Sequence, residues 1–153
     1  MRAALLLLFA AFAAGCDQAP QPPPAITEAQ VLDFVRTYVG ATNEGDATKV
    51  VNMIEKGEAV TSVAYGELFR GWNEIRNQVD AGISEAARTR VTLATITVRP
   101  LGPDAAIAVA PFSMTLIAKK GMPSVPGAAT LVVQRFPDGL RLIHEHYSLK
   151  LSN

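Results

Sequence analysis

The sequence predicts an α+β domain in which N-terminal helices pack against a curved antiparallel sheet. Two observations support this. Between about residues 27 and 86, apolar residues recur at intervals of three and four, which is the spacing of helices with one buried face. Beyond Arg88 the period changes to two, and segments rich in Thr, Val and Ile alternate in polarity, as half-buried strands do. Helices followed by a series of long strands form an α+β arrangement, with the sheet curving over the helices.

Residues 1–15 are predicted to be a signal peptide. Arg2 precedes an uncharged apolar run, Ala3–Ala14, that is shorter than the roughly 20 residues of a membrane-spanning helix. Small residues then lead into Cys16, the only cysteine of the chain. The stretch 13–16 resembles a bacterial lipobox, although it has Ala where Leu is most common. This resemblance implies that Cys16 is lipidated and begins the mature chain. The alternative is an ordinary cleaved signal peptide with an incidental cysteine.

Residues 16–25 are predicted to be the acylated cysteine and a tether. Four prolines within Asp17–Ala25 favour an extended spacer between the lipid and the domain. We therefore expect a protein of the cell envelope that is anchored in a membrane through Cys16 and faces the periplasm. In some Gram-negative bacteria, Asp after the cysteine retains lipoproteins in the inner membrane, so Asp17 favours that membrane.

Residues 26–153 have the length of one domain. The apolar content of 49% is sufficient for a core without disulfides, and 14 basic residues balance 14 acidic ones. Because the chain has no basic stripe, nucleic acid is not an expected partner. The sequence also has no glycine-rich phosphate loop and no serine-nucleophile motif, and we assign no cofactor.

Three helices are predicted at the start of this domain. Thr27 and Gln30 form a capping box for the first, which ends near Gly45, a residue suited to a left-handed C-cap. Asp46 caps a second, shorter helix, and a third is expected from about residue 71 to 86. The apolar faces of the three helices are formed by Val31, Phe34, Val35, Tyr38 and Ala41, by Val50, Val51, Met53 and Ile54, and by Trp72, Ile75, Val79 and Ile83.

Five strands are predicted. They are 59–65, between the second and third helices, and 89–99, 105–118, 127–136 and 139–151 after them. Gly66 and Gly71 are expected to flank a turn, and Pro111 indicates a bulge or a sheet edge within its strand. Pro137-Asp138-Gly139 is a strong hairpin signal before the last strand.

The last strand, Gly139–Leu151, carries the candidate site. Strict alternation places His144 and His146 on the same face. They share it with Leu140, Leu142 and Ser148, whereas the opposite face has Arg141, Ile143, Glu145, Tyr147 and Leu149. We expect the face with the two histidines to form the wall of a pocket.

Three motifs resemble the SnoaL-like branch of the nuclear transport factor 2-like superfamily: Asn43-Glu-Gly-Asp46, Gly71-Trp-Asn-Glu-Ile75 and His144-Glu-His-Tyr-Ser148. The resemblance spans nearly all of residues 26–153 and implies a SnoaL-like domain with the cystatin-like cone of that superfamily. Because this fold serves isomerases, cyclases, dehydratases, binding modules and dimerisation domains, it does not define one activity. It also implies a homodimer formed through the open face of the sheet.

Three roles are open to His144 and His146. A metal site needs a third ligand, and Glu145 is expected to face the other side, so we assign no metal. An imidazole in an apolar cone is suited to proton transfer beside a carbonyl group. The third role is polar lining of a pocket or a dimer interface. Superfamily enzymes that enolise ketosteroids pair a carboxylate base with Tyr and acidic donors. Tyr38 matches such a donor, but no acidic residue is expected on the pocket face, which argues against that chemistry.

Two functions are compatible with these residues. In the first, a membrane-tethered module binds a small apolar ligand or serves as a dimeric scaffold, without catalysis. In the second, an isomerase-, dehydratase- or cyclase-type enzyme acts on a small apolar carbonyl compound, with His144 or His146 as general acid or base. The residues expected to line the cone are Tyr38, Tyr65, Trp72, Phe112, Met114, His144 and His146.

Overall fold

A computed structural model describes residues 24–64, 66–85, 89–116 and 124–150. The predicted signal peptide, Cys16 and most of the tether lie outside the described residues, as does Tyr65. The helices are α1 (Glu28–Glu44), α2 (Ala47–Asn52) and α3 (Gly71–Glu85). The strands are β1 (Thr61–Ala64), β2 (Glu67–Arg70), β3 (Thr89–Leu93), β4 (Thr97–Pro100), β5 (Ala105–Leu116), β6 (Val125–Phe136) and β7 (Gly139–Leu149).

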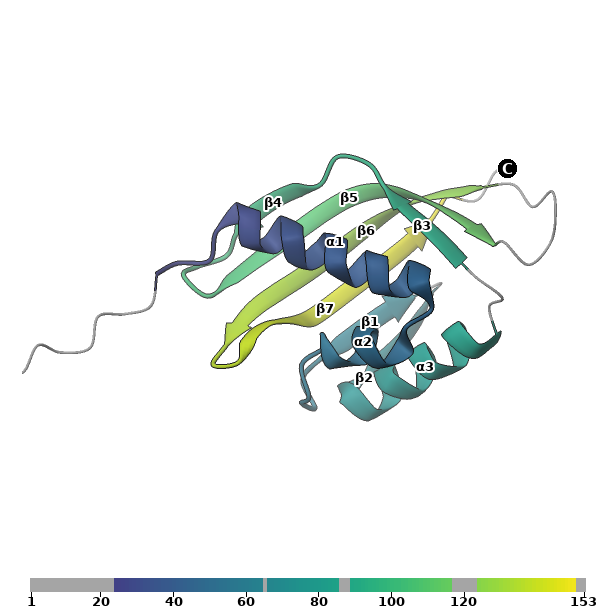
Figure 1. The fold of residues 1–153 in the computed structure, drawn as a ribbon, viewed down its shortest axis with the longest axis horizontal. Helices are drawn as coiled ribbons and strands as arrows, with labels where there is room; N and C mark the ends of the chain where they lie inside the picture. The colour runs from purple at the N-terminus through teal and green to yellow at the C-terminus, as the bar shows by residue number, and fades with distance from the viewer. Residues whose placement is uncertain (1–23, 65, 86–88, 117–123, 151–153) are drawn as a thin grey trace, which may run out of the picture.

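These strands form one sheet in the order β2-β1-β7-β6-β5-β3, and β4 pairs with β5 beyond the end of β3. Every pairing is antiparallel except that of β1 with β7. Figure 1 shows α1 lying across the curved sheet and α2 and α3 lying beside β1 and β2. The predicted α+β class, with N-terminal helices against a curved and mostly antiparallel sheet, is confirmed.

The helix boundaries follow the local signals in the sequence. Thr27 caps α1 by accepting a hydrogen bond from the Gln30 N–H, and the Gln30 side chain accepts one from the Thr27 N–H, which completes the capping box. Gly45 ends α1 with φ at 74°, a left-handed conformation that glycine adopts without steric cost. Asp46 then caps α2. No helix in the described ranges is long and apolar enough to cross a membrane.

The core lies between the helices and the inner face of the sheet. From α1 it includes Val31 and Val35, and from the sheet Ala108, Leu131 and Val133, each at most 1% exposed. On β5 the predicted inward row, from Ala106 through Phe112, is buried as expected because alternate residues of a strand share a face. These apolar faces bring α1 against β3, β4 and β5.

The predictions for two segments of the chain are wrong. The segment between Gly66 and Gly71 is not a simple turn, because β2 forms a short hairpin with β1. The predicted strand 89–99 is divided, since β3 and β4 pair with different parts of β5. Pro111 lies opposite this break, where its carbonyl accepts a hydrogen bond from the Ala94 N–H at 2.9 Å. In an antiparallel strand the N–H and C=O of one residue point to the same side, so the Pro111 nitrogen also faces the break between β3 and β4. The missing N–H therefore removes no hydrogen bond to β6.

A bulge in β7 is the largest departure from the predicted pattern. Val132 pairs with His144, but Val133 pairs with Leu142, so Ile143 is an extra residue on β7. Leu142 also exchanges backbone hydrogen bonds with Met53 and Glu55, after α2, whereas residues 144–147 pair with β1. The strand therefore changes its second neighbour at the bulge.

This bulge reverses the alternation of β7. Leu142 and Glu145, three residues apart, are 1% and 4% exposed and face the core, and Tyr147 packs against the core as well. The expectation that His144 and His146 continue the face of Leu142 is wrong, because one inserted residue moves every later side chain to the other side of a strand.

Candidate ligand cavity around Glu145

A cavity of about 500 Å³ lies between the helices and the inner face of the sheet. Its walls come from α1, the α1–α2 turn and α2, from α3, and from β1, β3, β5 and β7. The apolar part of the wall is formed by Val50, Val79, Ile83, Val91, Phe112 and Met114. Small-molecule sites usually have volumes of roughly 300–1,000 Å³ and mostly apolar walls with a few polar groups. This cavity has both properties.

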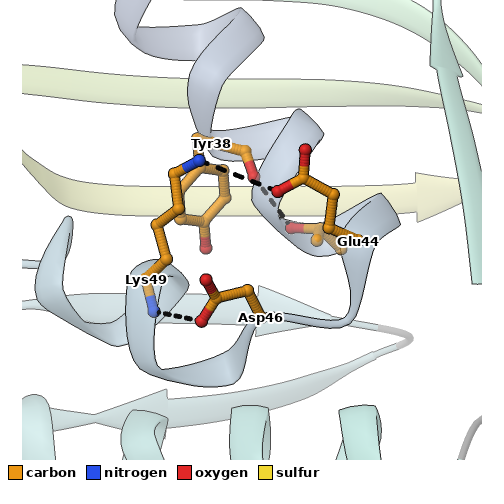
Figure 2. A network of polar contacts seen from close by, with 5 residues as sticks. Tyr38, Glu44, Asp46 and Lys49 are labelled. Carbon is orange, nitrogen blue, oxygen red and sulfur yellow. Dashed lines mark hydrogen bonds and ion pairs between the residues drawn. The ribbon is translucent and has the colours of Figure 1, made fainter.

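The turn between α1 and α2 forms part of the cavity wall. Figure 2 shows the polar contacts of this turn. Asp46 accepts a hydrogen bond from the Lys49 N–H at 2.9 Å. The Lys49 ammonium group reaches back to the Glu44 carboxylate at 3.7 Å, and both groups are exposed. Exposed ion pairs stabilise little. The cap by Asp46 and the left-handed Gly45 therefore hold the turn, and both are local features of the sequence.

Asn43 ties this turn to the edge strand β3. Its Nδ2 donates to the Val91 carbonyl at 2.8 Å, and its Oδ1 accepts from the Val91 N–H at 2.6 Å. The side-chain amide thus makes the hydrogen bonds to Val91 that the backbone of a further strand would make at this edge of the sheet. Both residues line the cavity, so this pair of hydrogen bonds joins α1 to β3 within its wall.

The polar centre of the cavity is Glu145, on β7. The Tyr38 hydroxyl, from α1, donates to its Oε2 at 2.9 Å, and the Ser62 hydroxyl, from β1, donates to its Oε1 at 2.8 Å. Tyr147, two residues further along β7, also hydrogen bonds to it. Three hydroxyl groups from three elements therefore converge on one buried carboxyl group.

Burial and hydrogen bonding have opposite effects on Glu145. Desolvation disfavours the carboxylate and raises its pKa, whereas the hydrogen bonds from Ser62, Tyr38 and Tyr147 lower it. Burial is the stronger effect, so the pKa lies above 4.5. Burial also raises the pKa of Tyr38 well above 10, and the Glu145 charge adds to that shift. The carboxyl group can accept hydrogen bonds when ionised and donate one when protonated.

The structure brings together only part of the predicted lining. The predicted residues that line the cavity are Tyr38, Phe112 and Met114. Trp72 does not line it. The Lys56 ammonium and Arg76 guanidinium groups lie 5.7 and 5.5 Å from the centre of the Trp72 ring, which indicates a cation–π cluster beside α3. The prediction for Tyr65 concerns a residue outside the described ones.

His144 and His146 are not among the residues that line the cavity. They lie on the outer face of the sheet, where His146 is exposed and His144 is half-buried, with its Nδ1 2.8 Å from the Thr61 hydroxyl oxygen. Desolvation, with a smaller contribution from His146, lowers the pKa of His144. Glu145 takes the inward position that the sequence pattern assigned to the histidines.

Four residues of the site were missed by sequence reasoning: Asn43 in its bridging role, Ser62, Glu145 and Tyr147. The signal for Glu145 was present, since it is the only acidic residue of β7. Strict alternation placed it on the wrong face. Within the described ranges, no group of three or more His, Cys, Asp or Glu residues is placed to hold a metal ion.

A curved sheet that encloses N-terminal helices and a cavity is the fold of the nuclear transport factor 2-like class. A provisionally assigned dehydratase of that family from Streptomyces avermitilis matches with 19% identity and a TM-score of 0.73, over 81% of this chain and 96% of that chain. A superfamily protein from Salmonella enterica matches with 19% identity and a TM-score of 0.71, over 82% and 92%. At these identities the likeness establishes the fold alone.

The chain belongs to the family described as the calcium/calmodulin dependent protein kinase II association domain, whose family model matches residues 27–150. A structure provisionally assigned to the same domain, from Xanthomonas campestris, is 19% identical with a TM-score of 0.69, over 89% of this chain and 100% of that chain. The expected superfamily is confirmed, since this association domain has the nuclear transport factor 2-like fold. Comparison with curated proteins finds no match.

Proposed function

We propose that this is a lipid-anchored protein of the cell envelope whose cavity binds a small, largely apolar ligand. One observation carries the binding proposal: the cavity of about 500 Å³ has mostly apolar walls, and its described lining includes a buried polar cluster centred on Glu145. This combination is typical of small-molecule sites, in which the apolar wall supplies affinity and a few polar groups set orientation.

The anchor is supported by the sequence of residues 1–25. The apolar run that leads into Cys16 and the Pro-rich segment after it form a membrane-attachment signal followed by a spacer. Mass spectrometry of the protein from its own host should find Cys16 acylated at the N-terminus of the mature chain. Cys16→Ser should remove the lipid and release the protein from the membrane fraction. An unmodified Cys16 in the mature protein would contradict the anchor and leave the binding proposal untouched.

The binding proposal is tested by filling the cavity. Gly82, on α3, lines the cavity, and a Cβ atom there would meet no atom within 4 Å. Gly82→Phe should therefore occupy the space that a ligand needs. Gly40→Phe is the matched control, because Gly40 is also helical and also has open space around its Cβ position, but does not line the cavity.

The measurement is calorimetric titration with 1-naphthalenemethanol, an apolar bicyclic body with one hydroxyl group. The wild type and Gly40→Phe should bind it, and Gly82→Phe should lose at least tenfold in affinity. Equal binding by all three proteins would contradict the proposal. Native mass spectrometry of the gently extracted protein would also identify a ligand retained from the host.

Assembly as a homodimeric scaffold is a second candidate, favoured by the outer face of the sheet. Cross-strand partners share a face, so Val63, His146, Thr130 and Val109 form a row across four strands. Val109 is 42% exposed. The matched family is described as an association domain, which agrees with assembly. Val109→Lys should shift a dimer to monomer in size-exclusion chromatography with light scattering, and leave naphthalenemethanol binding unchanged.

The catalytic alternative, in which His144 or His146 transfers a proton, has weaker support. A general acid or base must reach its substrate within hydrogen-bond distance. Both imidazoles lie on the opposite side of β7 from the cavity, so neither reaches a ligand bound there.

A further inference from the structure

The described residues that line the cavity include acidic side chains but no basic ones. Among the described residues that line it, the ionisable ones are Tyr38, Glu44, Glu145 and Tyr147, and there is no Lys, Arg or His. Glu44 is exposed and lies 3.7 Å from the Lys49 ammonium group, so solvent screens it. Glu145 is 4% exposed, and no cationic side chain of the described lining neutralises it. Buried carboxylates are normally paired with a cation, because an isolated buried charge is costly.

The hydroxyl groups around Glu145 determine what the cluster offers to a ligand. A carboxylate can only accept hydrogen bonds. With Glu145 ionised, the Tyr38 and Ser62 hydroxyls both use their single proton to donate to it. The remaining lone pairs of the tyrosine oxygens and of the carboxylate are then all acceptors. Such a cluster fits a group that carries several N–H donors.

The aromatic rings around the cluster favour the same group. Tyr38, Phe112 and Tyr147 all line the cavity, and Phe112 and Tyr147 meet edge to face with ring centres 5.9 Å apart. The faces of aromatic rings attract cations, most strongly where water is excluded. A buried carboxyl group in a cavity lined by three aromatic residues is therefore a suitable site for a positive charge.

We propose that the cavity selects a small amine, with an apolar body held by the cavity walls and one protonated nitrogen held by Glu145, Tyr38 and Tyr147. This inference rests on the proposed function, because it names the ligand class of the same cavity. The ammonium group supplies the missing counter-charge and donates to the acceptors of the cluster. A carboxylate ligand of the same shape meets Glu145 without any compensating cation in the described lining, so anions are rejected.

The test uses three naphthalene compounds that share a body and differ in one group. They are 1-naphthylmethylamine, 1-naphthalenemethanol and 1-naphthoate, measured by calorimetric titration at pH 7.5. The full chain is reconstituted in phosphatidylcholine nanodiscs, and empty nanodiscs correct for partition into lipid. The amine should bind at least tenfold more tightly than the alcohol, and the naphthoate should show no binding.

Glu145→Gln tests the origin of that preference. The amide keeps the shape of the side chain and removes the charge. The variant should therefore bind the amine no more tightly than it binds the alcohol. Glu67→Gln, which removes an exposed acid away from the cavity, should keep the full preference for the amine.

The outcomes separate the two proposals. If the alcohol binds the wild type as tightly as the amine does, or if the naphthoate binds best, the amine proposal is wrong and the ligand cavity stands. If none of the three compounds binds, the proposed function fails, and the amine proposal fails with it. The comparison of the three compounds on the wild type gives a result even if Glu145→Gln does not fold. Tyr38→Phe, which removes one acceptor, should then reduce the preference for the amine.

Discussion

Two neighbouring residues of β7 have opposite surroundings. Glu145 faces the cavity, is 4% exposed and receives hydrogen bonds from Tyr38 and Ser62. His144 faces outward and is half-buried, and its Nδ1 lies 2.8 Å from the Thr61 hydroxyl oxygen. Desolvation raises the pKa of the acid and lowers the pKa of the imidazole, so burial favours the neutral form of each. The inner face thus holds a polar group inside an apolar site, whereas the outer face presents polar groups on a surface.

The difference shows that residue type alone does not identify the functional face of a strand. Two histidines on one face are the more conspicuous pattern, yet the cavity contains the single acid between them. The bulge at Ile143 determines which of these side chains face the cavity, and this bulge is a property of the pairing between β6 and β7.

The largest expected effect is the loss of stability on truncating the inner face. Leu131 and Val132 are neighbours on β6, and they face inward and outward, respectively. Leu131 is 1% exposed, and Leu131→Ala should lower the free energy of unfolding by about 2–5 kcal/mol, because a cavity opens in the core. Val132→Ala on the partly exposed face should cost less than about 1.5 kcal/mol. Urea unfolding followed by circular dichroism measures both, and equal losses would contradict the assignment of the faces.

The hydrogen bonds of Asn43 give the next largest effect. Asn43→Ala removes two hydrogen bonds to Val91, and at about 0.5–1.5 kcal/mol each the loss should be about 1–3 kcal/mol. Asn43→Asp keeps the acceptor for the Val91 N–H and loses the donor, so its loss should be intermediate. Hydrogen exchange of the Val91 amide should become faster in Asn43→Ala. Unchanged exchange would show that β3 is held at this edge by something else.

Glu145→Gln should change how stability depends on pH. Because the folded protein raises the pKa of Glu145 above 4.5, the native state binds this proton more tightly than the unfolded chain does. Its contribution to stability is complete below about pH 4.5 and decreases as the pH rises through the folded pKa. The unfolding free energy of the variant should therefore gain on the wild type as the pH rises from about 4.5 through the folded pKa. Urea titrations across this range measure the difference, and parallel curves would contradict the raised pKa.

The smallest expected effect concerns the pKa of His144, whose contribution to stability has the opposite dependence on pH. Its pKa is lowered from 6.5 in the folded protein, so its contribution to stability is present above about pH 6.5 and is lost as the pH falls through the folded pKa. His146→Gln removes the smaller of the two causes, and should move the His144 titration part of the way back towards 6.5. An NMR titration of the imidazole resonances measures this shift. An unchanged titration would leave burial as the whole cause.

The sequence by itself determined most of the helices and strands and their order. The capping box at Thr27, the left-handed Gly45 and the cap at Asp46 are signals that act within a few residues, and the structure has each of them. The change from helical to strand periodicity likewise depends only on side chains close in the chain. The α+β class therefore followed from local patterns and their order, and the superfamily from the resemblance of three short motifs to a known family.

Only the tertiary structure decided the site. The distance along the chain between Tyr38 and Glu145 is 107 residues, and between Ser62 and Glu145 it is 83, so no local pattern joins them. The division of the segment 89–99 into β3 and β4, and the bulge at Ile143, depend on which strands lie alongside. Pairing partners fix register, and one extra residue on a strand exchanges its inner and outer faces. For that reason only the tertiary structure determined which face of β7 lines the cavity, whereas most of the helices and strands that form the cavity could be predicted from the sequence.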